Sequence, residues 1–244
     1  MAGSTSSSPS PQRRRGINGD TEDHSALADG ESPNQTPEKS PTALQQHISF
    51  FDRDNDGIIW PSDVYNGFRE LGFCILFSLG SLLIPVFFSY PTRLGHSWIP
   101  DPLLRIYVND IHKAKHGSDS GIYDFDGNFN AERFDQMFGR FDTSGTGGLS
   151  AGDLAALLRK DRCAADPAGW SFAFMEWGTT WLLMQKDGRV WKDDLRACYD
   201  GTLFWRISEE RSKGDGWQKG YGINDFVYSL WHSGTWKYWE AKTK

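Results

Sequence analysis

The twelve residues from Asp52 to Asp63 have the composition of a loop that holds a calcium ion. Carboxylates occupy positions one, three, five and twelve, glycine occupies position six, and an aliphatic residue occupies position eight. In an EF-hand loop the early acids surround the ion, a main-chain carbonyl at position seven adds an oxygen, and position twelve closes the shell. The predicted calcium ligands are Asp52, Asp54, Asp56, the carbonyl of Ile58, and Asp63.

Position twelve of this loop holds Asp63, where most EF-hands have glutamate. Because aspartate is one methylene shorter, it reaches the ion less easily with both oxygens, and we expect a modest affinity. A surface turn rich in Asp and Asn is the alternative interpretation. Apolar residues recur at helical spacing on both sides of the loop, which favours the EF-hand. These residues are Leu44, Ile48 and Phe51 before it and Val64, Phe68 and Leu71 after it.

Two later segments repeat parts of the same pattern. Segment 142–153 keeps the glycine and the aliphatic position but carries only two carboxylates, Asp142 and Asp153. Segment 183–194 has Leu183 at position one, which excludes normal ligation. We expect the two segments to pair as a degenerate EF-hand that binds little or no calcium. Ordinary turns between helices are the alternative.

Three histidines could bind a metal or transfer protons. His47 lies at the edge of the apolar face of the helix that leads into the calcium loop, and His112 and His116 are four apart on a predicted helix. Two imidazoles at that spacing can share a ligand, although a histidine satisfied by surface or core contacts is commoner. The chain has no Cys-x-x-Cys-His motif, so a haem would be held noncovalently.

Residues 71–92 contain no charged side chain and are long enough to cross a bilayer once. Pro85, with further prolines at positions 91, 100 and 102, predicts instead a broken helix that enters an apolar phase and returns on the same side. A buried core helix is the alternative, which an uncharged run of this length disfavours. We therefore expect residues 71–103 to anchor the protein to lipid.

Overall composition argues against several classes of protein. The net charge of −6 disfavours a nucleic-acid partner, because phosphate binding needs a basic face. The three cysteines lie far apart and predict no disulfide framework, which fits a reducing, cytosol-facing environment. Residues 1–40 are rich in Ser, Pro, Gly and charge, which predicts a disordered tail and not a cleaved signal peptide.

Together these features predict a mainly α, EF-hand-like helical protein with an apolar, proline-containing lipid-anchoring hairpin. The predicted divisions are a disordered tail (1–40), an EF-hand calcium-binding segment (41–70), a lipid-anchoring segment (71–103) and a helical C-terminal region with the degenerate loops (104–244).

Several of these stretches resemble the caleosins, also called peroxygenases. The resemblance covers about residues 43–204 and rests on three stretches and the prolines between them: Leu44-Gln-Gln-His47, His112 to Asp124, and Cys198-Tyr-Asp-Gly-Thr-Leu-Phe204. It implies a protein of lipid droplets and of the cytosolic face of the endoplasmic reticulum membrane, with one Ca²⁺ site, a proline-knot hairpin and a noncovalent haem b. The haem-associated histidines of the family correspond to His47 and His116. The proline knot corresponds to residues 98–102, although the longer, more polar stretch before them leaves the hairpin tip undefined.

The activity that this resemblance implies is calcium-dependent transfer of oxygen from fatty-acid hydroperoxides to unsaturated lipids or other acceptors. Iron with two permanent histidine ligands could not bind a hydroperoxide. Either His47 or His116 is therefore expected to be the proximal ligand, while the other dissociates or acts as a distal acid or base. A calcium-binding structural protein of lipid droplets without catalysis is the alternative. A soluble calcium sensor with a peptide groove is a third hypothesis, which the apolar anchor disfavours. Self-association is left open.

Overall fold

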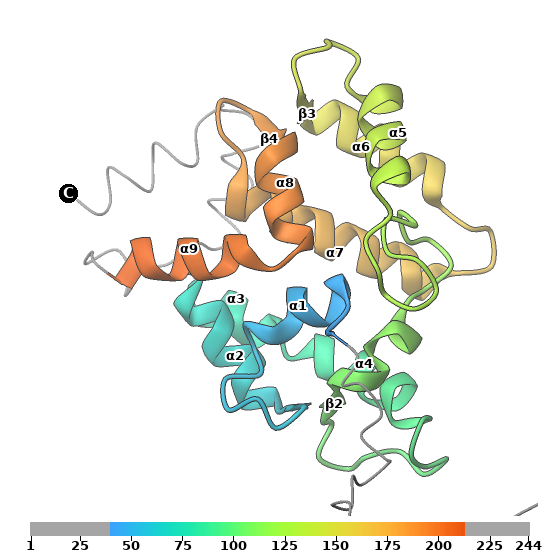
Figure 1. Ribbon diagram of the computed structural model, residues 1–244, viewed down its shortest axis with the longest axis vertical. Helices are drawn as coiled ribbons and strands as arrows, with labels where there is room; N and C mark the ends of the chain where they lie inside the picture. The colour runs from blue at the N-terminus through green and yellow to red at the C-terminus, as the bar shows by residue number, and fades with distance from the viewer. Residues whose placement is uncertain (1–39, 213–244) are drawn as a thin grey trace, which may run out of the picture. The chain divides into compact units, whose positions relative to one another are not determined.

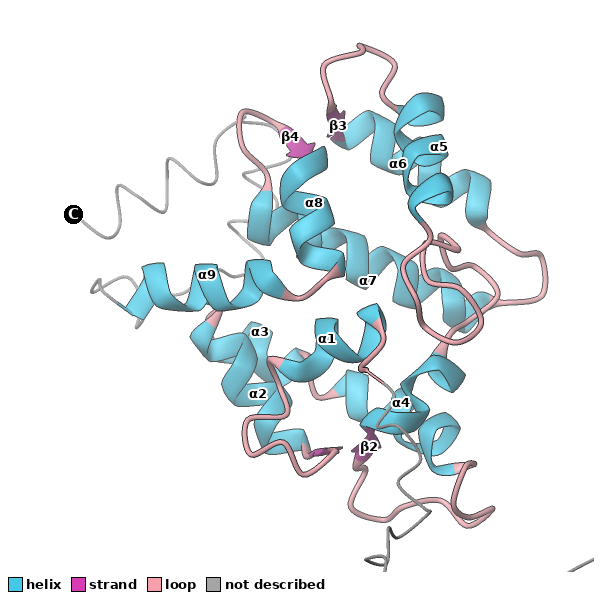
Figure 2. Cartoon of the chain, in the orientation of Figure 1, coloured by secondary structure: helices cyan, strands magenta, loops and turns pink. Residues whose placement is uncertain are grey.

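The computed structural model describes residues 40–212, which are mainly α-helical, as predicted (Figures 1 and 2). The predicted tail lies outside the described residues except for Ser40, as do residues 213–244. The helices are α1 (Ala43–Ser49), α2 (Pro61–Glu70), α3 (Ile75–Gly80), α4 (Leu83–Arg93), the 3₁₀ helix η1 (Val108–Ala114), α5 (Ala131–Phe141), α6 (Ala151–Asp161), α7 (Pro167–Met184), α8 (Lys192–Tyr199) and α9 (Thr202–Ser212). The strands are β1 (Ile58–Ile59), β2 (Ile106–Tyr107), β3 (Gly148–Ser150) and β4 (Arg189–Trp191).

Short antiparallel ladders join the loops between helices. β3 pairs with β4, so that Leu149 faces Val190 and the two degenerate loops form one unit. β1, which belongs to the predicted calcium loop, pairs with β2 through Ile59 and Ile106. The partner of the calcium loop is therefore the strand that follows the apolar segment, which the sequence pattern did not indicate.

The apolar segment is an interrupted helix made of α3 and α4. Pro85 has no N–H with which to continue the helical ladder, and a turn at Ser81 and Leu82 separates α3 from α4. Among the described residues, the stretch Ile75–Arg93 has the length and hydropathy of a membrane-crossing helix. Only 28% of its most apolar window is buried, whereas the core helix of a soluble protein is mostly buried. After α4 the chain returns to β2 through residues 94–105, which form turns and no helix.

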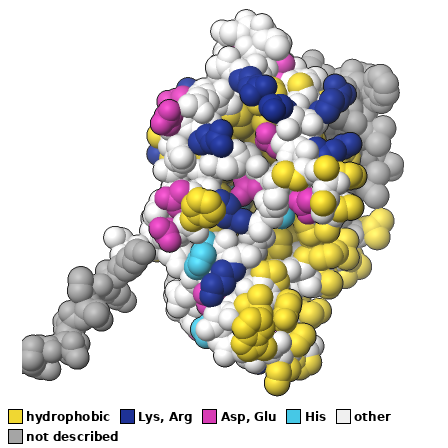
Figure 3. Space-filling view, turned by 90° about the vertical axis from the view of Figure 1, so that its right-hand side faces the viewer, with side chains coloured by type: hydrophobic (Ala, Val, Ile, Leu, Met, Phe, Trp, Pro, Cys, Tyr) yellow, Lys and Arg dark blue, Asp and Glu magenta, His cyan; other side chains and the backbone are white. Residues whose placement is uncertain are grey.

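The polarity of this helix is inverted relative to a helix of a soluble core. Its buried side chains include hydroxyls, namely Ser78, Ser81, Ser89 and Thr92. Its exposed side chains are apolar, namely Ile75, Leu76, Leu79, Leu83, Val86, Phe87 and Tyr90. Figure 3 shows hydrophobic side chains gathered over the lower and right-hand parts of one face. A contiguous exposed apolar face of this kind marks an interaction with lipid or protein.

α1, which carries His47, is short and is held by contacts from several directions. Thr42 caps the helix, because its hydroxyl accepts the Gln45 N–H and its own N–H donates to the Gln45 side chain. On the opposite side, a Cβ at Gly201 would lie 2.3 Å from the Gln46 carbonyl oxygen. Glycine at position 201, with φ +80°, therefore lets α1 approach the turn between α8 and α9.

Candidate functional site

Asp52, Asp54 and Asp56 form an acidic cluster in which one carboxylate oxygen from each residue lies within 4.8 Å of those of the other two. Asp52 is buried, and its Oδ1 has no hydrogen-bond partner among the described residues. Burial raises the pKa of Asp52, and the charges of Asp56 and Asp54 add to the increase. A bound cation would satisfy the free oxygen and offset this repulsion, so the donor set fits the calcium ion that the sequence predicts.

The two remaining predicted ligands are the Asp63 carboxylate and the Ile58 carbonyl. Asp63 accepts the Trp60 N–H at 2.8 Å and thereby caps the first turn of α2, and it is not part of the acidic cluster. Ile58 lies in β1 opposite Tyr107, with its N–H donated to Asp56 at 2.7 Å. The structure thus brings together three of the four predicted carboxylate ligands.

The second loop satisfies its carboxylates with its own donors. Asp142 accepts the Gly147 N–H at 2.6 Å and the Ser144 hydroxyl at 2.9 Å. Asp153 accepts the N–H and hydroxyl of Ser150 and the hydroxyl of Thr143, at 2.7–2.9 Å. Burial opposes ionisation, but these hydrogen bonds hold the pKa of both carboxyls below the usual value. In this loop hydroxyl donors therefore stabilise the carboxylates, as a bound cation would in a calcium-binding loop.

His47 is a partly buried imidazole with a defined tautomer. Its Nδ1 lies 2.7 Å from the carbonyl oxygen of Cys198, and since a carbonyl only accepts, Nδ1 carries the proton and Nε2 keeps a lone pair. The ring packs edge-on against Phe204 and Tyr123. Burial lowers the pKa of His47, which favours the neutral imidazole. Burial also raises the pKa of the Cys198 thiol to about 12, which favours the protonated thiol.

His116 does not share a helix with His112, contrary to the sequence prediction. η1 ends at Ala114, because Lys115 has an extended backbone and its ammonium donates to the carbonyls of Tyr123 and Asp124. His116 lies in the loop that follows, so the four-residue spacing does not place His112 and His116 on one face of a helix.

The imidazole of His116 lies between two carboxylates from α7 and its cap. Nδ1 is 3.8 Å from Asp166 Oδ2, and Nε2 is 3.8 Å from Glu176 Oε2. The interaction with Glu176 raises the pKa of His116, although burial opposes the increase. Glu176 also acts electrostatically on His47, so one carboxylate is near both histidines. Neither acid was predicted from the sequence, in which only the Asp166-Pro167 pair indicates the start of a helix.

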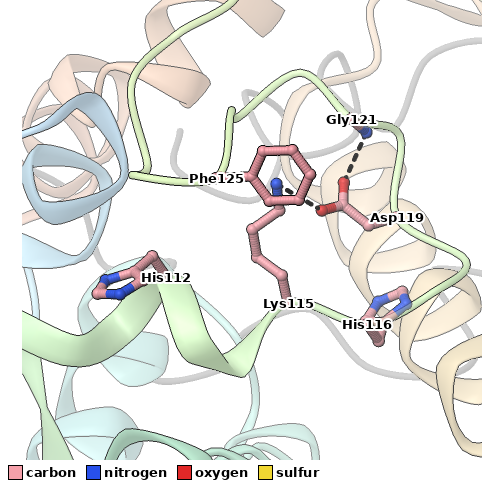
Figure 4. A pocket seen from close by; sticks show the side chains of 6 residues that line it. All are labelled: His112, Lys115, His116, Asp119, Gly121 and Phe125. Carbon is pink, nitrogen blue, oxygen red and sulfur yellow. Dashed lines mark hydrogen bonds and ion pairs between the residues drawn. The ribbon is translucent and has the colours of Figure 1, made fainter. Parts of the chain in front are cut away.

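A hollow of about 410 Å³ opens beside His116 (Figure 4). Its lining comprises His112, Lys115, His116, Asp119, Gly121 and Phe125. Figure 4 shows His112 and His116 on opposite sides of it. Phe125 is 95% exposed, on a turn in which Asp124 accepts the N–H groups of Asp126 and Asn128.

The apolar face of α4 lies close to this site. The Phe172 ring of α7 is 6.0 Å from the His116 ring and 4.4 Å from the ring of Phe87, measured between centroids. Phe87 belongs to the exposed apolar face. One aromatic side chain therefore separates a candidate site residue from the surface that the sequence predicts to contact lipid.

The chain is similar to proteins of known name. A family described as "Caleosin related protein" matches residues 39–208. A "Peroxygenase" of Lilium longiflorum is 38% identical over 173 residues, which cover 70% of this chain and 72% of the relative. "Probable peroxygenase 4" of Arabidopsis thaliana is 40% identical over 69% of this chain and 87% of its own length. A "Probable inactive peroxygenase-like protein" of the same plant is 32% identical over 37% of this chain and 44% of its own length. No solved structure matches the chain.

Proposed function

Because the chain belongs to the caleosin family, we propose that it is a calcium-dependent haem peroxygenase of the lipid-droplet surface. Its peroxygenase-named relatives identify it as a plant-type peroxygenase, a hydroperoxide-dependent oxidoreductase. The proposed reaction transfers oxygen from fatty-acid hydroperoxides to unsaturated lipids or other acceptors. The observation that carries the proposal is the position of His116, which borders an open hollow and shares a neighbouring carboxylate, Glu176, with His47.

The donors of this site fit a noncovalently held haem b. His47 offers an Nε2 lone pair, and the imidazole of His116 borders the open hollow. Bound haem would supply the redox chemistry by which a hydroperoxide is cleaved and its oxygen transferred. We assign His47 as the permanent ligand, because its ring is fixed by the Cys198 carbonyl and its pKa is lowered.

We assign a different role to His116, because it faces the hollow that admits substrate. In this assignment its imidazole takes the proton of the hydroperoxide and returns it to the leaving oxygen, acting as an acid and base. Glu176 favours the protonated imidazole that this transfer requires. Phe172 excludes water from one side of the ring, and Phe125 offers an apolar contact for an acyl chain at the mouth of the hollow.

The substrate is proposed to arrive from lipid through the apolar face of α3 and α4. Fatty-acid hydroperoxides partition into lipid, and Phe87 on that face contacts the Phe172 ring that covers His116. The lipid partners are the lipid droplet and the cytosolic face of the endoplasmic reticulum membrane. Calcium would act at the acidic cluster of Asp52, Asp54 and Asp56, a short distance along the chain from His47.

The visible absorption spectrum of the purified protein, measured beside hydroperoxide-dependent oxidation, tests this proposal. The wild type is expected to show a Soret band. His47→Ala should lose most of the haem, whereas His116→Ala should keep haem and lose turnover by about 100-fold or more. His112→Ala is the matched control, because it lines the same hollow and should keep most activity. Full haem and full activity in both His47→Ala and His116→Ala would overturn the assignment.

A non-catalytic calcium-binding structural protein of lipid droplets is the second candidate. The observation that favours it is the similarity to a relative named as inactive, although that similarity spans only 37% of the chain. The two candidates differ in the same experiment. A protein that binds calcium and lipid but shows no Soret band after supply of haem would support the second candidate.

A further inference from the structure

We infer that Asp166 is a positioning residue that determines which ring nitrogen of His116 carries the proton. The inference deepens the proposed function, because it concerns the histidine assigned there to proton transfer. Its physical content, a coupling between one carboxylate and one imidazole, does not require bound haem.

Asp166 is fixed in place by three hydrogen bonds. Its Oδ1 accepts the Gly169 N–H at 2.9 Å, which caps α7. Its Oδ2 accepts the N–H and the hydroxyl of Ser118, at 3.0 and 2.9 Å. A Cβ at position 169 would lie 1.9 Å from Oδ2, so glycine leaves the space that the carboxylate occupies. Asp166 therefore joins the start of α7 to the loop that carries His116.

The same oxygen faces the imidazole of His116. Nδ1 of His116 lies 3.8 Å from Asp166 Oδ2, is buried, and has no hydrogen-bond partner among the described residues. Buried polar atoms without a partner are rare, and at 3.8 Å the carboxylate oxygen still attracts a proton on this nitrogen electrostatically. Since an ionised carboxylate only accepts hydrogen bonds, the contact stabilises the tautomer with the proton on Nδ1.

Glu176 favours the opposite tautomer, because its carboxylate lies 3.8 Å from Nε2. Its side chain is 54% exposed, whereas that of Asp166 is 22% exposed and is held by three donors. Water screens the exposed carboxylate more strongly, and ordering its side chain costs conformational entropy. Asp166 therefore has a larger effect than Glu176 on the tautomer of the neutral imidazole. Nε2 of His116 then has a free lone pair, as Nε2 of His47 has through the Cys198 carbonyl.

Nitrogen-15 NMR of the full-length apoprotein measures the tautomer directly. The long-range proton–nitrogen spectrum is recorded at a pH above the imidazole pKa, and the His116 signals are assigned from His116→Gln. In the wild type we expect the Nδ1–H tautomer to predominate. In Asp166→Asn, whose amide still caps α7 but can donate to Nδ1, the ratio of Nδ1–H to Nε2–H should fall by about tenfold.

Asp153→Asn is the matched control. Asp153 accepts the N–H and hydroxyl of Ser150 at the start of α6, much as Asp166 accepts those of Ser118, and none of its hydrogen bonds involves a histidine. Asp153→Asn should leave the His116 tautomer unchanged, and the His47 signals should be unchanged in every variant. Ser118→Ala removes one of the bonds that fix Asp166, so it should shift the ratio in the same direction to a smaller extent.

The inference is overturned if Asp166→Asn and Ser118→Ala leave the tautomer ratio at the wild-type value, or if wild-type His116 is mainly the Nε2–H form. Should Asp166→Asn not fold, Ser118→Ala alone decides. The result is independent of the proposed function. A tautomer shift in a protein that never binds haem would support the positioning role and reject the peroxygenase, whereas haem binding without a tautomer shift would do the reverse.

Discussion

Asp52 and Asp142 occupy the first position of two EF-hand loops but have opposite environments. Asp52 is buried beside two other acids, one of its oxygens lacks a hydrogen-bond partner in the described chain, and its pKa is raised. Asp142 accepts hydrogen bonds from within its own loop, and its pKa is lowered. A cation therefore relieves repulsion at the first loop and would have to displace hydroxyl donors at the second.

We predict that this difference determines where calcium binds. Asp52→Ala or Asp56→Ala should weaken binding by about two orders of magnitude, because each removes a charged ligand from a small cluster. Asp142→Ala is the matched control and should change the affinity little. Titration calorimetry of the calcium-free protein measures the three variants. Similar losses from the two loops would show that the second loop is also a calcium site.

At the scale of the element, α3 and α4 present apolar side chains outwards and hydroxyls inwards. Thr92 shows how the inner face is satisfied, because its hydroxyl donates to the Phe88 carbonyl and accepts the Tyr107 N–H from β2. The apolar side chains on the outer face thus do not pack into the protein core. An external partner would bury them, and in the proposed function this partner is lipid.

We predict that charge on this face abolishes lipid binding without unfolding the protein. Leu79 and Val86 are both exposed, so aspartate at either position should be tolerated by the fold. A charged residue moved into hydrocarbon costs on the order of 2 kcal/mol or more, which corresponds to a loss of at least about tenfold in partitioning. Flotation with artificial lipid droplets measures the effect. Ala155→Asp, at an exposed position of α6, is the control, and equal flotation of all variants would reject this face.

The turns after α4 are organised around a buried carboxylate, Asp101. It accepts hydrogen bonds from Arg105 at 2.7 Å, from the Leu103 N–H at 3.0 Å and from the Tyr107 hydroxyl at 3.0 Å. Burial opposes ionisation, but these donors lower the pKa of Asp101 to about 2. The residues of the predicted proline knot are therefore tied to β2 by a charged network.

We predict that this network makes a pH-dependent contribution to stability. The pKa of Asp101 is about 2 in the folded protein against 3.8 ordinarily, so its ionised form is favoured by folding. Its contribution, on the order of 2 kcal/mol, is complete above the ordinary pKa and is lost as the pH falls through the folded value. Urea unfolding of the wild type and Asp101→Asn should differ at neutral pH and converge in acid. A difference that is constant with pH would contradict this account.

At the scale of the whole molecule, the β1–β2 ladder determines the topology of the apolar segment. The two strands flank that segment in the sequence and pair with each other, so in the proposed lipid-bound protein both ends of the segment would lie on one side of the lipid layer. A single crossing would place the predicted calcium loop and the loop that carries His116 on opposite sides of the lipid layer, and it would separate β1 from β2.

We predict that tags at the N-terminus and after Lys244 are both digested by protease added outside sealed microsomes. The reason is that β1 and β2 can pair only when the chain before and after the apolar segment shares one compartment. Tags digested only after addition of detergent, in a fusion with a lumenal protein, serve as the control for sealed vesicles. Protection of one tag but not the other would reject both the ladder and a haem shared by His47 and His116.

Local patterns were sufficient to predict much of this molecule. The acidic cluster was predictable because its members are neighbours in sequence, and Leu183, at the first position of the third loop, lies in the core and is 2% exposed. Contacts between distant segments were not predictable. Ile106 belongs to a strand of two residues, too short for a period-two pattern, and Asp166 and Glu176 reach His116 only through the packing of α7. Lys115 ended the helix expected over His112 and His116 through contacts with carbonyls farther along the chain.

The β1–β2 ladder also fixes an order of events on the ribosome. Ile58 and Ile59 are synthesised before the apolar residues, whereas Ile106 and Tyr107 are synthesised after them. β1 in the predicted calcium loop therefore cannot pair with β2 until residues 75–93 have left the exit tunnel. Because chains fold from the N-terminus as they emerge, the apolar helix leaves the ribosome before the strand that pairs with the predicted calcium loop.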